Sequence, residues 1–140
     1  MAMTDSVKML ASVPIFEGLS KKELHAIAGA GKQVTHAPGS ALAREGDSGV
    51  GFFLILDGVA SVTVGERPRR KLGPGDFFGE ISLLDQGPRS ASVFAQTSVT
   101  TFGLTAWVFK RLVEQNPAIA SKMLKVMAQR LRSSSRDITH

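Results

Sequence analysis

Glycine and proline interrupt the middle of the chain at short intervals. Ten of the 14 glycines lie between positions 39 and 87. The segments between them are short and apolar or alternating, such as 52–56 and 60–64. Short strands separated by turn residues are typical of a β-sandwich or β-barrel. We therefore expect residues of about 32–105 to form a mainly β structure.

Residues of about 6–30 are expected to be helical. Ser20 suits the N-cap of a helix, and Glu23 follows it by three positions. This is the capping-box pattern, in which each side chain accepts a hydrogen bond from the other residue's backbone N–H. Leu24 and Ile27 then give the helix an apolar edge.

Residues of about 106–135 are predicted to form two helices, separated near Asn116 and Pro117. Proline suits the first turn of a helix, where its missing N–H has no helical partner. The expected apolar face of the first helix comprises Trp107, Phe109, Leu112 and Val113. That of the second, at spacings of 4, 3 and 4, comprises Ala120, Leu124, Met127 and Leu131, widened by Ile119, Met123 and Val126. Such a stripe either packs within its own molecule or forms the seam of a weak dimer.

The net charge of +5 belongs to the C-terminal end of the chain. Residues 101–140 carry seven basic and two acidic residues, whereas residues 1–100 carry ten of each. A basic end can bind nucleic acid or an acidic partner, or it can be a solvated helix face. The chain has no Tyr and one Trp, so a stacking platform for single strands is not expected.

Several classes of protein are excluded by what the sequence lacks. Without cysteine it cannot form a disulfide scaffold, a thiolate nucleophile or an iron–sulfur cluster. A cupin-like metalloenzyme needs at least two histidines and an acid inside the barrel. His25 falls in a helical segment and His140 ends the chain, which leaves only His36, interpreted as a surface residue. We therefore expect no metal, no cofactor and no catalytic residue.

Targeting features are also missing from the sequence. No apolar run approaches the ~20 residues of a membrane-spanning helix. The first ten residues lack the charged-then-apolar order of a signal peptide. These observations lead us to expect a cytoplasmic protein without a membrane partner.

The segment from Phe77 to Val93 contains the residues best suited to bind a ligand. Gly79 allows a close backbone approach, and the N–H groups that begin a helical turn after it would attract an anion. Arg89 can pair with the same anion through two parallel hydrogen bonds. Glu80 would repel a phosphate but suits a ribose hydroxyl. Together they predict a nucleotide site, unless Glu80 and Arg89 pair with each other on the surface.

This segment and its flanking motifs resemble the cyclic nucleotide-binding domains of catabolite activator-type regulators, cAMP-dependent protein kinase regulatory subunits and cyclic nucleotide-gated channels. The similar motifs occur in the family's order over nearly the whole chain, at 10–20, 38–49, 54–62, 73–93 and 116–131. The resemblance implies a single domain over residues 1–140. It also implies an eight-stranded antiparallel β-roll, a jelly-roll-like double-stranded β-helix, with N-terminal helices and C-terminal lid helices.

The resemblance also implies roles for individual residues. The ligand-binding set comprises Gly79, Glu80, Ile81, Ser82, Arg89, Ser90 and Ala91. In it Glu80 takes the ribose 2′-hydroxyl, Arg89 pairs with the cyclic phosphate, and Ser90 and Ala91 lie near phosphate and base. The possible lid residues are Leu124, Met127 and Leu131.

The function implied by the resemblance is that of a non-catalytic receptor for cAMP, with cGMP bound more weakly. Its output would be movement of the C-terminal helix, read by an effector protein or a fused domain. The alternative is the ligand-sensing fragment of a transcription regulator, whose helix-turn-helix would follow the lid helix. The chain would be a monomer or a weak dimer through that helix.

Overall fold

The computed structural model describes residues 3–46, 51–79, 89 and 91–139. Within these it contains eight strands. They are β1 (Lys32–His36), β2 (Ala41–Ala43), β3 (Gly51–Asp57), β4 (Ala60–Val64), β5 (Arg67–Leu72), β6 (Phe77–Phe78), β7 (Ser92–Ala95) and β8 (Val99–Thr105). The helices are α1 (Met3–Ala11), the 3-10 turn η1 (Pro14–Phe16), α2 (Lys21–Ala30), α3 (Ala106–Gln115) and α4 (Pro117–Thr139).

The chain divides into two compact units. A helical unit comprises Met1–Gly29 together with Arg111–His140, and a β unit comprises Ala30–Lys110. That residues 1–140 act as a single domain stays a prediction.

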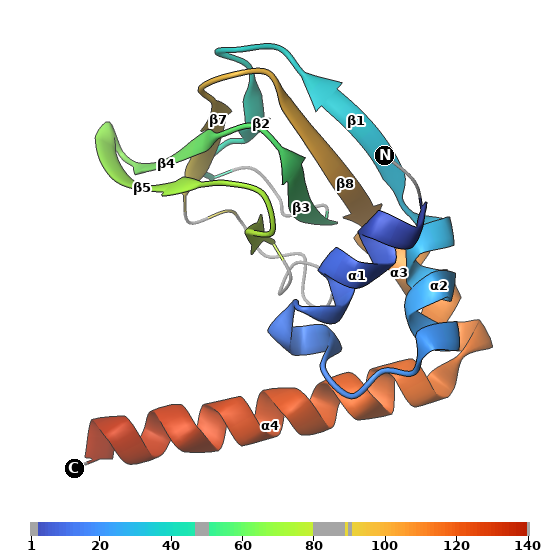
Figure 1. The fold of residues 1–140 in the computed structure, drawn as a ribbon. Helices are drawn as coiled ribbons and strands as arrows, with labels where there is room; N and C mark the ends of the chain where they lie inside the picture. The colour runs from blue at the N-terminus through green and yellow to red at the C-terminus, as the bar shows by residue number, and fades with distance from the viewer. Residues whose placement is uncertain (1–2, 47–50, 80–88, 90, 140) are drawn as a thin grey trace. The chain divides into compact units, whose positions relative to one another are not determined.

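The β unit is a long hairpin rolled into two sheets. Strand β1 pairs with β8, β2 with β7, β3 with β6, and β4 with β5, all antiparallel. Pairing of β3 with β8 and of β4 with β7 then completes two four-stranded sheets, in the orders β1-β8-β3-β6 and β2-β7-β4-β5 (Figure 1). This arrangement confirms the expected eight-stranded antiparallel β-roll with flanking helices.

The core of the β unit is built by both sheets. Ile55 and Val99 come from one sheet, and Ala60, Leu72 and Val93 come from the other, all at most 3% exposed. Half-buried residues that pack against this cluster are Leu42, Ala43, Val62 and Phe78. Phe78 lies on β6, so the core extends to the beginning of the predicted ligand-binding segment.

The helical unit contains the expected capping box. The Ser20 N–H donates to Oε1 of Glu23 (2.8 Å), and the Glu23 N–H donates to Oγ of Ser20 (3.1 Å). The same Oε1 accepts from Nζ of Lys122 on α4 (2.7 Å). The hydrogen bond from Lys122, then that from Ser20, lower the pKa of Glu23. One carboxylate therefore begins α2 and connects it to α4.

The helical faces differ in part from those that the sequence predicted. On α3, Phe109 and Leu112 are buried as expected, but Trp107 is 68% exposed. Because a helix turns by about 100° per residue, Trp107 lies roughly 200° from Phe109 and falls on the opposite side. The expectation that Trp107 belongs to the apolar face is therefore wrong.

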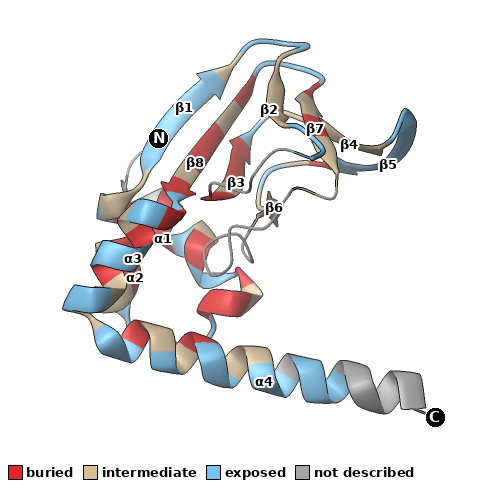
Figure 2. Ribbon diagram, turned by 180° about the vertical axis from the view of Figure 1, so that it is seen from behind, coloured by how far each residue is buried: buried red, intermediate tan, exposed pale blue. Residues whose placement is uncertain are grey.

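On α4 the most buried residues are Ile119 and Met123, at 0% and 1% exposure. Leu124 and Leu131 were both predicted to belong to the apolar stripe, but they are 62% and 71% exposed. The change from buried to exposed residues along the helix is visible in Figure 2. The helix also continues to Thr139, beyond the predicted end near 135.

Candidate functional site

The predicted ligand-binding residues are only partly within the described structure. Gly79, Arg89 and Ala91 are described, whereas Glu80, Ile81, Ser82 and Ser90 lie outside the described residues. The roles predicted for those four, and a pairing of Glu80 with Arg89, therefore stay predictions. Ala91 is half-buried and directly precedes β7.

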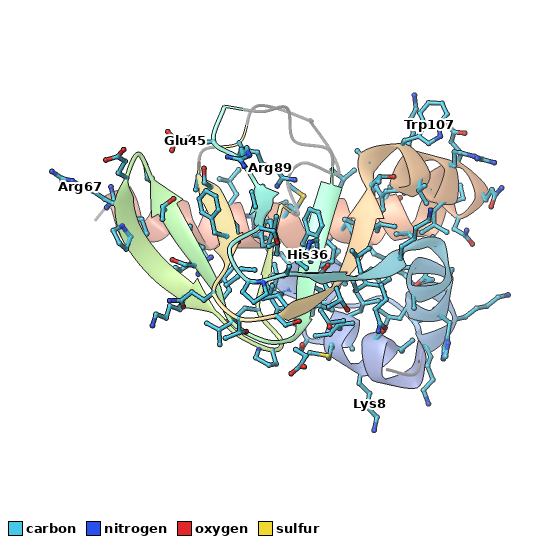
Figure 3. The ribbon with its side chains drawn as sticks, turned by 90° about the horizontal axis from the view of Figure 1, so that it is seen from above. Lys8, His36, Glu45, Arg67, Arg89 and Trp107 are labelled. Atoms are coloured by element: carbon cyan, nitrogen blue, oxygen red, sulfur yellow. The ribbon has the colours of Figure 1, made fainter. Side chains whose placement is uncertain are left out.

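Arg89 is held at both its backbone and its side chain. Its carbonyl oxygen accepts a hydrogen bond from the Gly46 N–H (2.9 Å). Its Nη2 donates to the carbonyl oxygen of Gly51, the first residue of β3 (2.9 Å). The guanidinium, labelled in Figure 3, is thus directed toward the beginning of a buried strand.

The guanidinium of Arg89 is partly removed from water. It is half-buried, and its Cζ lies 5.9 Å from the centre of the Phe78 ring. Burial lowers the pKa of Arg89, although an arginine this basic stays charged at neutral pH. Desolvation of a cation is unfavourable unless an anion or hydrogen bonds compensate it. The position therefore favours an anionic ligand.

No carboxylate is paired with Arg89 among the residues that the structure describes. The one ion pair found there joins Glu23 and Lys122. Glu45 precedes the glycine that binds the Arg89 carbonyl, but its Oε1 accepts from the Gly65 N–H instead (2.8 Å). None of the carboxylates in the described ranges therefore occupies the donors of Arg89.

Gly79 lies against both Arg89 and Gly51. Its φ of +81° is one that residues with a side chain rarely adopt. A Cβ at this position would collide with the carbonyl oxygen of Gly51 and with Nη1 of Arg89. Only glycine therefore lets the three groups meet. The structure brings Gly79 and Arg89 together, and their binding of a ligand stays a prediction.

Sequence reasoning missed Gly51 and Phe78 as parts of this site. A Cβ on Gly51 would collide with the Leu104 carbonyl oxygen on neighbouring β8, so the strand can pair closely only with glycine there. A glycine at the beginning of an apolar strand is a usable signal of close backbone approach. The contact of Phe78 with Arg89 had no signal in the sequence.

The ring of His36, the histidine considered as a metal ligand, contacts Thr101 and Phe53. His36 is half-buried, its Nε2 is 3.1 Å from Oγ1 of Thr101, and its ring meets Phe53 edge-on at 6.5 Å. Burial lowers its pKa. His36 is thus a partly exposed residue whose ring makes these two contacts. Among the described residues, no three His, Asp or Glu side chains are placed to hold a metal ion.

The possible lid residues differ in exposure. Leu124 and Leu131 are largely exposed, and Met127 is half-buried. Two large apolar side chains on α4 are therefore exposed and could cover a bound ligand.

Across the described ranges, no helix is long and apolar enough to cross a membrane.

Comparison with known proteins finds one matching family and several similar proteins. The family model of the cyclic nucleotide-binding domain matches residues 33–116. A cyclic nucleotide-gated potassium channel of Rhizobium etli is 34% identical over 123 residues, which are 88% of this chain and 34% of the channel. A CRP-like cAMP-activated global transcriptional regulator of Mycobacterium tuberculosis is 29% identical over 138 residues, 94% of this chain and 61% of the regulator. The chain thus spans only part of these relatives.

Among solved structures, the N-terminal domain of a transcriptional regulator from Streptomyces coelicolor A3(2) has a similar fold. The TM-score is 0.85 at 28% sequence identity. The match covers 90% of this chain and 94% of that domain.

Proposed function

The chain belongs to the cyclic nucleotide-binding domain family, and on this premise we propose that it is a non-catalytic receptor for 3′,5′-cyclic AMP. The observation that supports this most is the half-buried Arg89 guanidinium, which lies beside Gly79 and has no carboxylate partner among the described residues. A relative named as cAMP-activated favours cAMP as the ligand.

In this proposal each part of the nucleotide has its own partner. Arg89 pairs with two oxygens of the cyclic phosphate, because a planar guanidinium matches that geometry. The backbone of Gly79 and Ile81 and the hydroxyl of Ser82 make further contacts. Glu80 accepts from the ribose 2′-hydroxyl. Ser90 and Ala91 lie near the phosphate and the base.

We assign no catalytic residue and no cofactor in this function. Holding a cyclic phosphate and a ribose requires neither a nucleophile nor a general base. The named relatives are a channel and a transcriptional regulator, not enzymes.

The response to the ligand is assigned to α4. Leu124, Met127 and Leu131 would cover the base, which would bury apolar surface that is exposed without ligand. Ligand binding would then shift the population of α4 positions, and an effector protein or a fused domain would read that shift. In this scheme residues 1–140 act as one domain, as a monomer or as a weak dimer through α4.

A second candidate function is that of the ligand-sensing part of a transcription regulator. It is favoured by the similarity to an isolated N-terminal regulator domain, 94% of which is covered. The ligand and the site would be the same, but the partner would be a DNA-binding segment.

Replacing both Leu124 and Leu131 by glutamine tests the lid. We expect cAMP affinity to fall about tenfold, as loss of ~1.4 kcal/mol of apolar burial would produce. The free energy of unfolding should stay nearly unchanged, because both side chains are largely exposed. Calorimetric titration and urea unfolding measure the two quantities. Ala128→Gln, at another exposed position of α4, is the matched control. Equal affinity of the double variant and this control would show that these leucines do not cover the ligand.

Ligand choice is predicted to depend on Ser90. Both cyclic nucleotides share the phosphate and ribose, so discrimination must come from the purine edge. We expect cAMP to bind about tenfold more tightly than cGMP, a difference of ~1.4 kcal/mol, because a relative named as cAMP-activated favours cAMP. Because a hydroxyl can accept from the guanine 2-amino group, Ser90→Ala should weaken cGMP binding more than cAMP binding.

Paired titrations of the wild type and Ser90→Ala with both nucleotides measure this preference. Ser98→Ala, an exposed serine elsewhere in the β unit, serves as control. Tighter binding of cGMP to the wild type would contradict the assignment of cAMP. An equal loss for both nucleotides in Ser90→Ala would show that the hydroxyl does not contact the base.

A further inference from the structure

Among the described residues, two groups hold the Arg89 guanidinium, and neither neutralises it. Nη2 donates to the Gly51 carbonyl oxygen, and the Phe78 ring lies within cation–π distance of Cζ at 5.9 Å. A guanidinium carries five N–H donors. The carbonyl uses one of them, and a ring face attracts the cation without using any. A carboxylate in the same place would occupy donors and cancel the charge that a ligand needs.

The Phe78 ring is itself fixed in place. It stacks on the Phe53 ring at 5.1 Å between centres and 19° between planes. The two residues are also direct partners in the pairing of β3 with β6. Phe53 in turn meets the His36 ring edge-on, and His36 is hydrogen-bonded to the fully buried Thr101. The Phe78 ring therefore ends a row of side chains in contact, which begins at buried Thr101 and continues through His36 and Phe53.

A free arginine side chain adopts many rotamers, and ordering it opposes binding. The arrangement of Phe78 and Gly51 reduces that cost before a ligand arrives. We propose that Phe78 is a positioning residue for Arg89, whose ring holds the guanidinium against the Gly51 carbonyl in the orientation that takes the ligand. The inference rests on the proposed function only in taking the ligand to be a cyclic phosphate.

The first test compares two neighbouring phenylalanines. Phe78→Leu should weaken cAMP binding by about 5- to 20-fold, the range that a partly desolvated cation–π contact allows. Phe77→Leu is the matched control, because the Phe77 ring packs against Phe52 and not against the arginine. Phe78→Tyr keeps the ring face and should bind like the wild type. Equal losses for Phe77→Leu and Phe78→Leu would overturn the proposal.

A double-mutant cycle separates positioning from simple loss of packing. If Phe78 acts through Arg89, Phe78→Leu should cause no further loss of affinity in an Arg89→Leu background. A full 5- to 20-fold loss in that background would show that the ring acts by another route and would contradict the proposal.

Two further measurements cover the case in which Phe78→Leu folds poorly. Fluorinated phenylalanines at 78 preserve shape but weaken the ring's attraction for a cation. Affinity should therefore fall progressively with fluorine content, whereas the same series at 77 should have no effect. In the unliganded wild type, ring current from Phe78 should displace the Arg89 side-chain NMR signals from those of the exposed Arg70, a comparison that needs no variant.

These readouts also distinguish the proposal from the function on which it rests. Wild-type protein that binds no cAMP would overturn the proposed function. The NMR displacement would still decide whether Phe78 holds Arg89, and its absence in the wild type would overturn the positioning role itself.

Discussion

Replacing Arg89 by leucine is expected to remove most of the affinity for cAMP and leave the β-roll folded. A charge-assisted, two-point contact with a phosphate contributes ~2–4 kcal/mol, which corresponds to a loss of roughly 30- to 1000-fold in affinity. The fold should persist because the guanidinium forms no ion pair among the described residues and leucine retains apolar contact with Phe78.

Calorimetric titration measures this loss, and far-ultraviolet circular dichroism with thermal unfolding checks the fold. Arg70→Leu removes an exposed cation from β5 and controls for the change in net charge. A folded Arg89→Leu protein with wild-type affinity would contradict the assignment of Arg89 to the phosphate.

Replacing Gly79 by alanine is expected to have the second largest effect. The positive φ costs an L-residue ~1–2 kcal/mol. In addition, the new methyl group would collide with the Gly51 carbonyl and with Nη1 of Arg89. Relief of the collision must move the guanidinium or the beginning of β3. Affinity for cAMP should therefore fall on the order of 100-fold, close to the effect of losing the arginine contact.

Gly75 provides a matched control for this substitution. Its φ is +92°, but a Cβ there would meet nothing within 4 Å. Gly75→Ala should therefore show the loss of stability due to backbone strain without the loss of affinity. Calorimetric titration and urea unfolding of both variants separate the two effects. If Gly79→Ala and Gly75→Ala bind cAMP equally well, the close contact at Gly79 has no part in binding.

The sequence allowed the β region to be located but not its strand pairing. Glycine and proline spacing marks where short strands end, and the strands lie within 32–105 as predicted. The pairing of β1 with β8, however, joins Lys32 to Gly103. Contacts so distant in the chain leave no local pattern, so the β-roll could be expected only from the resemblance to a family.

The candidate site could be proposed from the sequence where its residues lie in one segment. Gly79 and Arg89 are ten positions apart in a region of turn residues, and their types alone suggest an anion site. Gly51 and Phe78 could not be assigned to the site from the sequence, because only the fold brings β3 and β6 to Arg89.

The helix faces were predictable only in part. A helical pattern shows which residues share a face, but it does not show which of two adjacent faces is buried. On α4, Met123 is buried and its neighbour Leu124 is exposed.

Calorimetric titration of the unmodified chain with cAMP, followed by displacement with cGMP, tests most directly whether this chain is a cyclic nucleotide receptor. We predict saturable binding of one cAMP per chain, with cGMP about tenfold weaker. Arg89→Leu, measured in parallel, should give little or no heat at the same concentrations. Absence of saturable binding by the folded wild type at millimolar cAMP would contradict the central claim that Arg89 and Gly79 form a cyclic nucleotide site.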